Sequence, residues 1–435
     1  MNSTSQQSDG IVKGWVSSPG SRGSIDILWS CFFTISLCTW TTLCLNVPHP
    51  NDSDLRILMR KVKWMICGIF LPEFVLIIAT GQLASAQRSI KRFRALGHQH
   101  WTLRHSFFVD MGGLLLQPEG GTTFVVNNIQ LAYLVEKGYM ECPKISAEEI
   151  WDKSKANFLS KSLAFLQVSW FLFQLLGRTI VQLPITALEL LTSSIVLFTL
   201  GNLGCWFYKP NDIQKGITLH MGVSLESIIL ENADAAAIFS QHTACNSTVS
   251  RSLSPSRSTH ERPLERFSNA SYPHLSAIHK IVYLGLAKSA VALHLLAWNF
   301  EFPTHVECLG WRIASSTLMA MSLAIATFEF LVYEPDTHSW DQYLDPKRHS
   351  QTASVGTTDE EASWVQTVRS EEAAAHFLST WRTVIMRTIT ITYLVARSFL
   401  IIEALIGLRS QPADIYRILN VGDLLSGSTA SHSGS

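Results

Sequence analysis

The chain has 435 residues, of which 47% are hydrophobic and 16% are charged, and its formal net charge is zero. A soluble domain carries about 25% charged residues, so this deficit indicates apolar segments that cross a membrane. Equal numbers of acidic and basic residues give no support for nucleic acid as a partner. The eight cysteines contain no C-x-x-C pair, so we expect no disulfide framework and no zinc site, and we predict no cofactor.

The chain divides into three parts by composition. Residues 1–23 are polar and rich in Ser and Gly, without the basic-then-apolar layout of a cleavable signal peptide. Residues 24–408 form the predicted membrane domain, and residues 409–435 form a polar tail. Inside the membrane domain, the segments near 244–272 and 348–368 are rich in Ser, Arg and Pro or in Ser, Thr and acids. Such segments bury too little apolar surface to fold, so we expect two disordered inserts.

The membrane domain contains seven stretches that are long and apolar enough to cross the ~30 Å hydrocarbon core. They are residues 25–47, 62–83, 158–176, 185–207, 279–300, 311–332 and 383–408. Residues 123–138 and 209–239 have amphipathic patterns at helical spacing, typical of helices that lie in the interface. The predicted fold is therefore an all-α membrane protein, a bundle of about seven transmembrane helices with short amphipathic interfacial helices.

Basic residues favour one orientation of this bundle. Seven alternating spans place the cluster at 88–94 on the same side as the N-terminus, which predicts a cytosolic N-terminus and a lumenal C-terminus. The basic group at 56–63 opposes this orientation. Glycosylation sequons fall on both sides and make the protein a candidate glycoprotein, at Asn2, Asn51, Asn246 and Asn269.

Ionisable side chains inside the apolar stretches are the main candidates for function. Because a buried charge in a bilayer is costly, such groups face the interior of a bundle and have partners. The candidate catalytic residues are Glu73, Glu189, Glu329 and Asp26 as proton donors, with His294 and Asp110 as assisting groups. One interpretation is a shared polar pocket that protonates a lipophilic substrate. The other is interhelical ion pairing, for example of Arg397 with Glu73 or Glu329.

A second candidate motif lies between two apolar stretches. The string His105-Ser-Phe-Phe-Val-Asp110 fits the H-x-x-x-x-D pattern of glycerolipid acyltransferases, in which Asp orients His as a base. Pro118-Glu-Gly follows after only a few residues, whereas that family has a whole βα segment there. The alternative is a glycine-rich loop that packs its aromatic residues at the interface.

The opening block Ser21-Arg-Gly-Ser-Ile-Asp-Ile-Leu-Trp-Ser, with Leu45-Asn-Val-Pro and Trp101-Thr-Leu-Arg-His-Ser-Phe-Phe-Val-Asp-Met-Gly-Gly, resembles a large, mostly uncharacterised family of fungal multi-pass membrane proteins. The resemblance covers residues 22–408 and brings no known catalytic residues. By analogy it suggests secondary metabolism: an enzyme or accessory factor in the endoplasmic reticulum or another endomembrane, acting on a lipophilic small molecule, for example in acid-initiated terpenoid cyclisation. The alternative is a non-enzymatic transporter, channel or receptor-like protein.

Overall fold

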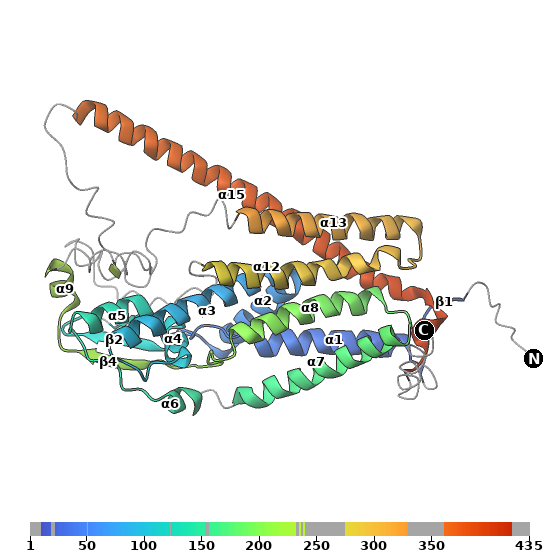
Figure 1. Ribbon diagram of the computed structural model, residues 1–435, viewed down its shortest axis with the longest axis horizontal. Coiled ribbons are helices and arrows are strands. Elements are labelled where there is room, and N and C mark those ends of the chain that lie inside the picture. Colours follow the sequence, from blue (N-terminus) through green and yellow to red (C-terminus); the bar gives the residue numbers. More distant parts are fainter. Residues whose placement is uncertain are drawn as a thin grey trace, which may run out of the picture.

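The computed structural model describes residues 10–18, 22–49, 51–121, 123–152, 156–231, 235, 238–239, 275–328 and 361–419. Its centre is a bundle of long helices that run side by side (Figure 1). Within these residues, six helical segments are long and apolar enough to cross a membrane. They are α1 (Ser24–Thr42), α7 (Ala156–Ile180), α8 (Ala187–Cys205), α12 (Ala277–Ala292) with the 3-10 segment η1 (Leu293–Asn299), α13 (His305–Thr327) and the C-terminal part of α15 (Glu361–Ile406).

The outer surface of this bundle is apolar, as a lipid environment requires. Large side chains that are more than one-third exposed occur along α1, α7, α12, α13 and α15, among them Trp29, Phe32, Phe165, Trp170, Ile281, Ile313, Ile391 and Ile402. A soluble protein rarely exposes so large a continuous apolar surface. Helix α8 is the central helix, with 72% of its apolar window buried against its neighbours. The prediction of a multi-pass helical membrane protein therefore agrees with the structure.

The expected span at 62–83 differs from this pattern, because a sharp break divides it. Helix α2 (Asp54–Phe70) and helix α3 (Pro72–Ala95) meet at Leu71 and are bent by 110°. Pro72 lacks a backbone N–H and its ring would clash with the preceding turn, so a helix cannot continue through it, although it begins a new one readily. Two helices with a tip between them therefore replace the expected single span.

Both legs of this pair reach the same end of the bundle. Lys61 of α2 binds Asp212 with a distance of 3.0 Å from Nζ to Oδ1, and Lys209 donates to Gln82 Oε1 of α3 at 2.8 Å. The tip lies between the helices of the bundle, where Ile69 O accepts a hydrogen bond from Arg397 of α15. The α2–α3 pair is thus a re-entrant hairpin that enters the bundle and leaves at the end where it entered.

The two chain ends give independent support for six crossings. Strand β1 (Ile11–Lys13) pairs antiparallel with strand β5 (Ser410–Pro412), just before α1 and just after α15. Gly14 N also donates to Arg409 O at 2.8 Å. Because the start of the first span and the end of the last lie at one end, the number of crossings is even. A bundle of about seven spans is therefore not confirmed, and the termini lie at one end of the bundle rather than on the predicted opposite sides.

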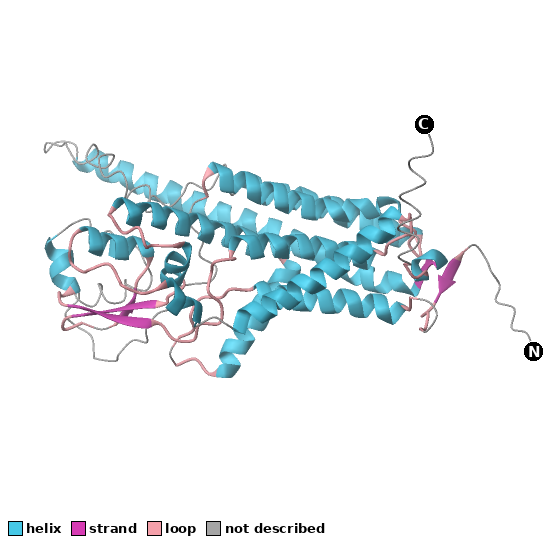
Figure 2. Cartoon of the chain, turned by 60° about the horizontal axis from the view of Figure 1, so that its bottom comes forward, coloured by secondary structure: helices cyan, strands magenta, loops and turns pink. Residues whose placement is uncertain are grey.

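At the other end of the bundle lies a small unit of mixed structure, so the prediction of an all-α protein is also incomplete (Figure 2). Strands β2 (Leu114–Pro118), β3 (Phe124–Val125) and β4 (Ile217–Met221) form a sheet of order β3-β2-β4, in which β2 and β4 are parallel. The short helices of this unit are α4 (Leu103–Asp110), α5 (Asn128–Glu136), α6 (Ala147–Asp152) and α9 (Leu225–Glu231).

This extramembrane unit has its own hydrophobic core. Most of its residues come from the segment between α3 and α7 and from the segment after α8. Helix α5 buries Leu131, Tyr133 and Leu134 in that core, so it is not the interfacial helix that its amphipathic pattern predicted. The expected helical pattern at 209–239 is also wrong in part, since residues 217–221 form β4. Gly112 ends α4 at a φ of 86°, and a Cβ on Gly113 would lie 2.5 Å from Phe108, so this turn into β2 requires both glycines.

The two expected inserts lie mostly outside the described residues. All of 244–272 and the part of 348–368 before residue 361 are outside them. Helix α15 begins at Glu361, so the end of the second insert belongs to a helix.

Candidate functional site

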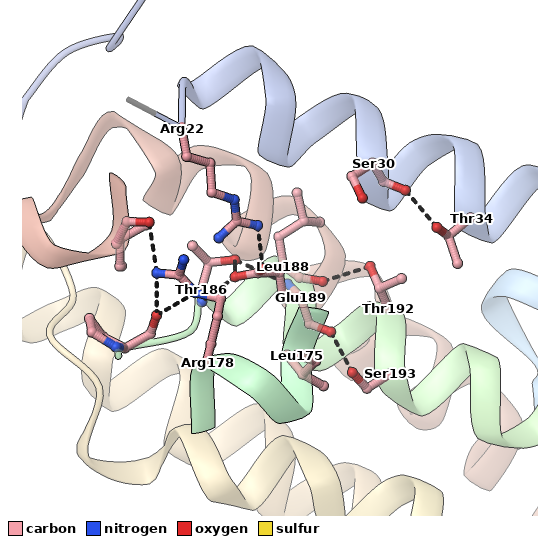
Figure 3. Close-up of polar contacts among 12 residues, drawn as sticks. Arg22, Ser30, Thr34, Leu175, Arg178, Thr186, Leu188, Glu189, Thr192 and Ser193 are labelled. Carbon is pink, nitrogen blue, oxygen red and sulfur yellow. Dashed lines mark hydrogen bonds and ion pairs between the residues drawn. The ribbon is translucent and has the colours of Figure 1, made fainter. Parts of the chain in front are cut away.

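Glu189 lies at the end of the bundle where the termini meet, and it is fully engaged (Figure 3). As the third residue of α8 it accepts hydrogen bonds on Oε2 from the backbone N–H and the hydroxyl of Thr186, each at 2.9 Å. Thr186 in return accepts from Glu189 N, which completes a capping box. The other carboxylate oxygen of Glu189 pairs with Arg22. These contacts fasten the segment before α1 to the start of α8.

Two further charged groups strengthen this end. Arg178 is buried at the end of α7 and donates to the carbonyl oxygens of Pro184 and Ile415, among others, at 2.8–3.3 Å. It thereby ties the α7–α8 connector to the C-terminal segment (Figure 3). Asp26 is exposed in the first turn of α1 and accepts from Gly23 N at 2.8 Å and from Ser18 Oγ at 2.5 Å. Asp26 therefore caps α1 and is not buried in the bundle.

His105 and Asp110 lie on the same short helix, α4, but have separate partners. His105 Nδ1 accepts from Thr102 N at 3.2 Å, and its Nε2 lies 2.8 Å from Ile145 O. Asp110 accepts from Ser85 Oγ at 3.1 Å and from Asn128 N at 3.0 Å. Burial lowers the pKa of His105 and raises the pKa of Asp110. Since no His–Asp contact forms and both His105 nitrogens are used, the acyltransferase interpretation finds no support in the geometry.

Glu73 lies at the tip of the re-entrant hairpin, in the first turn of α3. It is 3% exposed, and its Oε2 is 3.8 Å from Lys288 Nζ of α12. Lys288 also donates to Ser322 Oγ of α13. Within the described residues neither carboxylate oxygen of Glu73 has a partner at hydrogen-bond geometry. This ion pair joins the hairpin tip to two spans, but it lacks the hydrogen bonds that satisfy Glu189.

His294 and Arg397 form a second pair beside the hairpin tip. Arg397 Nη1 donates to His294 Nε2 at 2.9 Å, and His294 Nδ1 donates to Val291 O at 3.0 Å. Both side chains are inaccessible to solvent, as is Tyr393, one turn before Arg397 on α15. The structure therefore gathers Glu73 and His294 with Lys288, Tyr393 and Arg397, a set we call the tip cluster.

Of the other predicted site residues, Glu329 lies outside the described residues. The hypothesis of interhelical ion pairing named Arg397 as the partner of Glu73 or Glu329, whereas the cation closest to Glu73 in the structure is Lys288. Tyr393 and Ser322 were missed, because an isolated hydroxyl in an apolar span gives no sequence signal. Among the described residues, no three His, Cys, Asp or Glu side chains come together in a geometry for metal binding.

A groove of about 420 Å³ opens beside α7 and α8, at the end that carries the extramembrane unit. Its apolar wall consists of side chains from both spans and from the segment after α8, namely Phe165, Leu166, Leu203 and Phe207, with Ile150 and Trp151 of α6 on the other side. Three basic residues also line it, Arg104, Lys161 and Lys209. The guanidinium of Arg104 lies 4.5 Å from the ring centre of Trp151.

Lys209 connects this groove to the re-entrant hairpin. Its Nζ donates to Gln82 Oε1 of α3 at 2.8 Å and to Asn46 Oδ1, after α1, at 3.2 Å. Burial lowers the pKa of Lys209 to about 8, and the nearby Cys44 and Asp110 oppose that shift. None of the hydrogen-bond acceptors of Lys209 is charged, so its ammonium group has only neutral amide partners.

The chain matches the model of a family of unknown function, DUF8562, over residues 1–233 and 273–426, and it therefore belongs to that family. The interruption in the match contains the segment 244–272 that the sequence marks as an insert. No curated protein and no solved structure matches the chain. The fungal origin of the family remains a prediction.

Proposed function

We propose that the protein binds a lipophilic small molecule with an acidic head group in the groove beside α7 and α8. The observation that carries this proposal is a groove of about 420 Å³ that combines two features. Side chains of α7 and α8 give it an apolar wall, and three basic residues line it, Arg104, Lys161 and Lys209. Pockets of about 300–1,000 Å³ with a few placed polar groups are typical of small-molecule sites. The apolar wall accommodates the body of the molecule, and the basic residues neutralise its head.

Within this proposal the protein is an enzyme or an accessory factor that acts on a lipophilic metabolite, for example a terpenoid. The positions of the acids reduce the number of candidate proton donors. Asp26 and Glu189 are occupied as helix caps, and Glu73 does not line the groove. Among the described acids, Glu73 is buried with neither carboxylate oxygen in a hydrogen bond, and Glu403 is buried with one oxygen unpartnered. An acid-initiated cyclisation would depend on Glu73, the one of these two that lies at the hairpin tip.

Transport is the second candidate function, and the re-entrant hairpin favours it. Transporters place broken helices and buried charges near the bilayer midplane, where they meet substrates or coupling ions. Here the tip of α2–α3 carries Glu73 into a cluster with Lys288, Arg397 and His294. A transporter would bind its ligand on one side of the membrane and release it unchanged on the other, whereas an enzyme would convert it.

We further propose that the extramembrane unit faces the cytosol and that both termini face the lumen of an internal membrane. With the hairpin re-entrant, the basic residues of α2 and those of α3 fall at the same end, which removes the conflict between 56–63 and 88–94. That end also carries Arg104, Lys209 and Lys215, and the positive-inside rule assigns it to the cytosol. The orientation predicted from seven spans is thereby reversed.

Glycosylation mapping tests this orientation. Only the sequon at Asn2 precedes α1 and would be lumenal, whereas Asn51, Asn246 and Asn269 would be cytosolic. We expect Asn2→Gln to remove all glycan from the protein expressed in a eukaryotic host, and Asn51→Gln to change nothing. Glycan at Asn246 or Asn269 would contradict the proposed orientation.

The groove is tested by mass spectrometry of the molecules that copurify with the full chain. We expect an acidic amphiphile whose amount falls at least about fivefold in Lys161→Gln, which removes a head-group contact, and in Leu203→Trp, which fills the wall. Lys215→Gln is the matched control, because Lys215 is an exposed lysine at the same end that does not line the groove. Equal amounts of the amphiphile recovered from all variants would show that the groove is not its binding site.

Metabolite profiling of producing cells with and without the gene separates the functions. Loss of one compound with accumulation of an unmodified precursor indicates an enzyme or accessory factor. An altered distribution of an unchanged compound between cells and medium indicates transport.

A further inference from the structure

Arg397 is a fully buried cation whose hydrogen-bond partners are all neutral. Its Nε donates to Ile69 O at 3.3 Å and its Nη1 to His294 Nε2 at 2.9 Å. Its Nη2 has no partner among the described residues. Because a guanidinium can only donate, His294 Nε2 is the acceptor of this bond, and its Nδ1–H donates to Val291 O, so the imidazole is neutral. No carboxylate therefore pairs directly with this guanidinium within the described chain.

The single acid of the tip cluster is already shared with another cation. Glu73 lies 3.8 Å from Lys288 and is in electrostatic reach of Arg397, but it is not within ion-pair distance of the guanidinium. The described charged groups of the cluster are thus Lys288 and Arg397 against Glu73 alone, with His294 neutral and Tyr393 an uncharged phenol. A buried charge without a counter-charge is strongly unfavourable in a low-dielectric interior, so the unbalanced cation among the described groups favours a bound anion.

A second unpartnered group points to the same place. The hydroxyl of Tyr393 is buried and has no hydrogen-bond partner in the described residues. Tyr393 lies one helical turn from Arg397 on α15, so both side chains project from the same face of that helix. A phenolic O–H and a guanidinium N–H are both donors, and together they suit an acceptor that carries negative charge.

We propose that the tip cluster binds one small monovalent anion, held by Arg397 Nη2 and the Tyr393 hydroxyl beside the tip of the re-entrant hairpin. The anion balances the second cation of the cluster, and Lys288 remains paired with Glu73. This site is separate from the groove and does not depend on the groove's ligand. Because Ile69 O, at the hairpin tip, binds the same guanidinium, the anion also stabilises the hairpin inside the bundle.

Chloride is the probe for this site. In a titration that exchanges gluconate for chloride at constant ionic strength, we expect the melting temperature of the full chain in detergent to rise with the chloride concentration and then to saturate. Equilibrium binding of radioactive chloride should give one ion per chain. Tyr393→Phe removes one donor and keeps the ring, so we expect chloride to bind about tenfold more weakly. Tyr133→Phe, a buried tyrosine of the extramembrane unit, should bind chloride as the wild type does.

Three results would overturn the proposal. One is a melting temperature that depends on ionic strength but not on chloride, and another is the absence of bound chloride in the wild-type protein. The third is unchanged chloride affinity in a folded Tyr393→Phe variant. Should that variant not fold, the stoichiometry of the wild type decides alone, since zero bound ions contradicts the proposal and one supports it.

Discussion

The two helical hairpins of the bundle, α2–α3 and α7–α8, differ in how their turns are satisfied. The turn of α7–α8 lies at the end of the bundle and is held by Arg178, Thr186 and the Arg22–Glu189 pair. The tip of α2–α3 lies among the spans, where Glu73 has one cation at 3.8 Å and no hydrogen bond within the described residues. The carboxylate at the α7–α8 turn thus has hydrogen-bond partners for both of its oxygens, whereas the carboxylate at the α2–α3 tip has none among the described residues.

This contrast separates charges that hold the fold from charges that are available for function. A buried polar network is stable when each member is satisfied and costly when it is not. Glu189 meets the first condition, because both of its carboxylate oxygens are bonded, although it lines a cavity of about 290 Å³ together with Arg22 and Arg178. Glu73 meets the second, and groups of this kind are retained in membrane proteins chiefly where they bind or move something.

The largest expected effect is the loss of Glu189. Glu189→Gln removes the charge that pairs with Arg22 and weakens the cap of α8, so we expect the free energy of unfolding to fall by about 3 kcal/mol. Asp414→Asn is the matched control at the same end, because the Arg417–Asp414 pair is about two-thirds exposed on each side. Thermal unfolding in detergent measures both, and equal losses would contradict the distinction between the two kinds of charge.

The α7–α8 hairpin could be predicted from the sequence, and the α2–α3 hairpin could not. Residues 158–176 and 185–207 are two apolar runs with a polar connector, and α7 and α8 follow them closely. Residues 62–83 look like a third run of the same kind, because hydropathy records how apolar a segment is and not where it turns. Pro72 was the available signal, since proline starts a helix more easily than it continues one.

The small sheet shows a second limit. Strands β2 and β4 are neighbours in space, with Leu115 paired to Thr218, but two membrane spans separate them in sequence. No local pattern reveals such a pairing, and the spacing of Ile217 and Met221 fits a helix equally well. The site has the same limit. Charged residues inside spans could be found, but their partners come from helices far apart in the chain.

Lys209 joins the two hairpins, and its titration should control the groove. Because its pKa is lowered to about 8, it is mostly protonated at pH 7 and mostly neutral at pH 9. An anion binds the protonated form, so affinity is retained below about pH 8 and lost above it, by roughly tenfold between pH 7 and pH 9. Burial raises the pKa of the neighbouring Cys44 thiol.

The measurement is the dissociation constant of the copurified amphiphile at several pH values. Lys209→Arg keeps the charge through this range and should flatten the profile. A wild-type profile without a change near pH 8 would remove Lys209 from the head-group contacts.

The smallest expected effect on stability is the loss of Glu73, and it gives the sharpest test of the comparison. Glu73→Gln removes a carboxylate that makes no hydrogen bond in the described structure, and Lys288 keeps its contact with Ser322. Lys288, whose side chain is 20% exposed, then loses its counter-charge, so we expect thermal unfolding to show a loss of about 2 kcal/mol, below that of Glu189→Gln. If Glu73 serves function, the same variant should lose its metabolite or transport phenotype while it accumulates normally. A variant that unfolds as readily as Glu189→Gln would instead show that the hairpin tip, like the turn of α7–α8, is held by its charges.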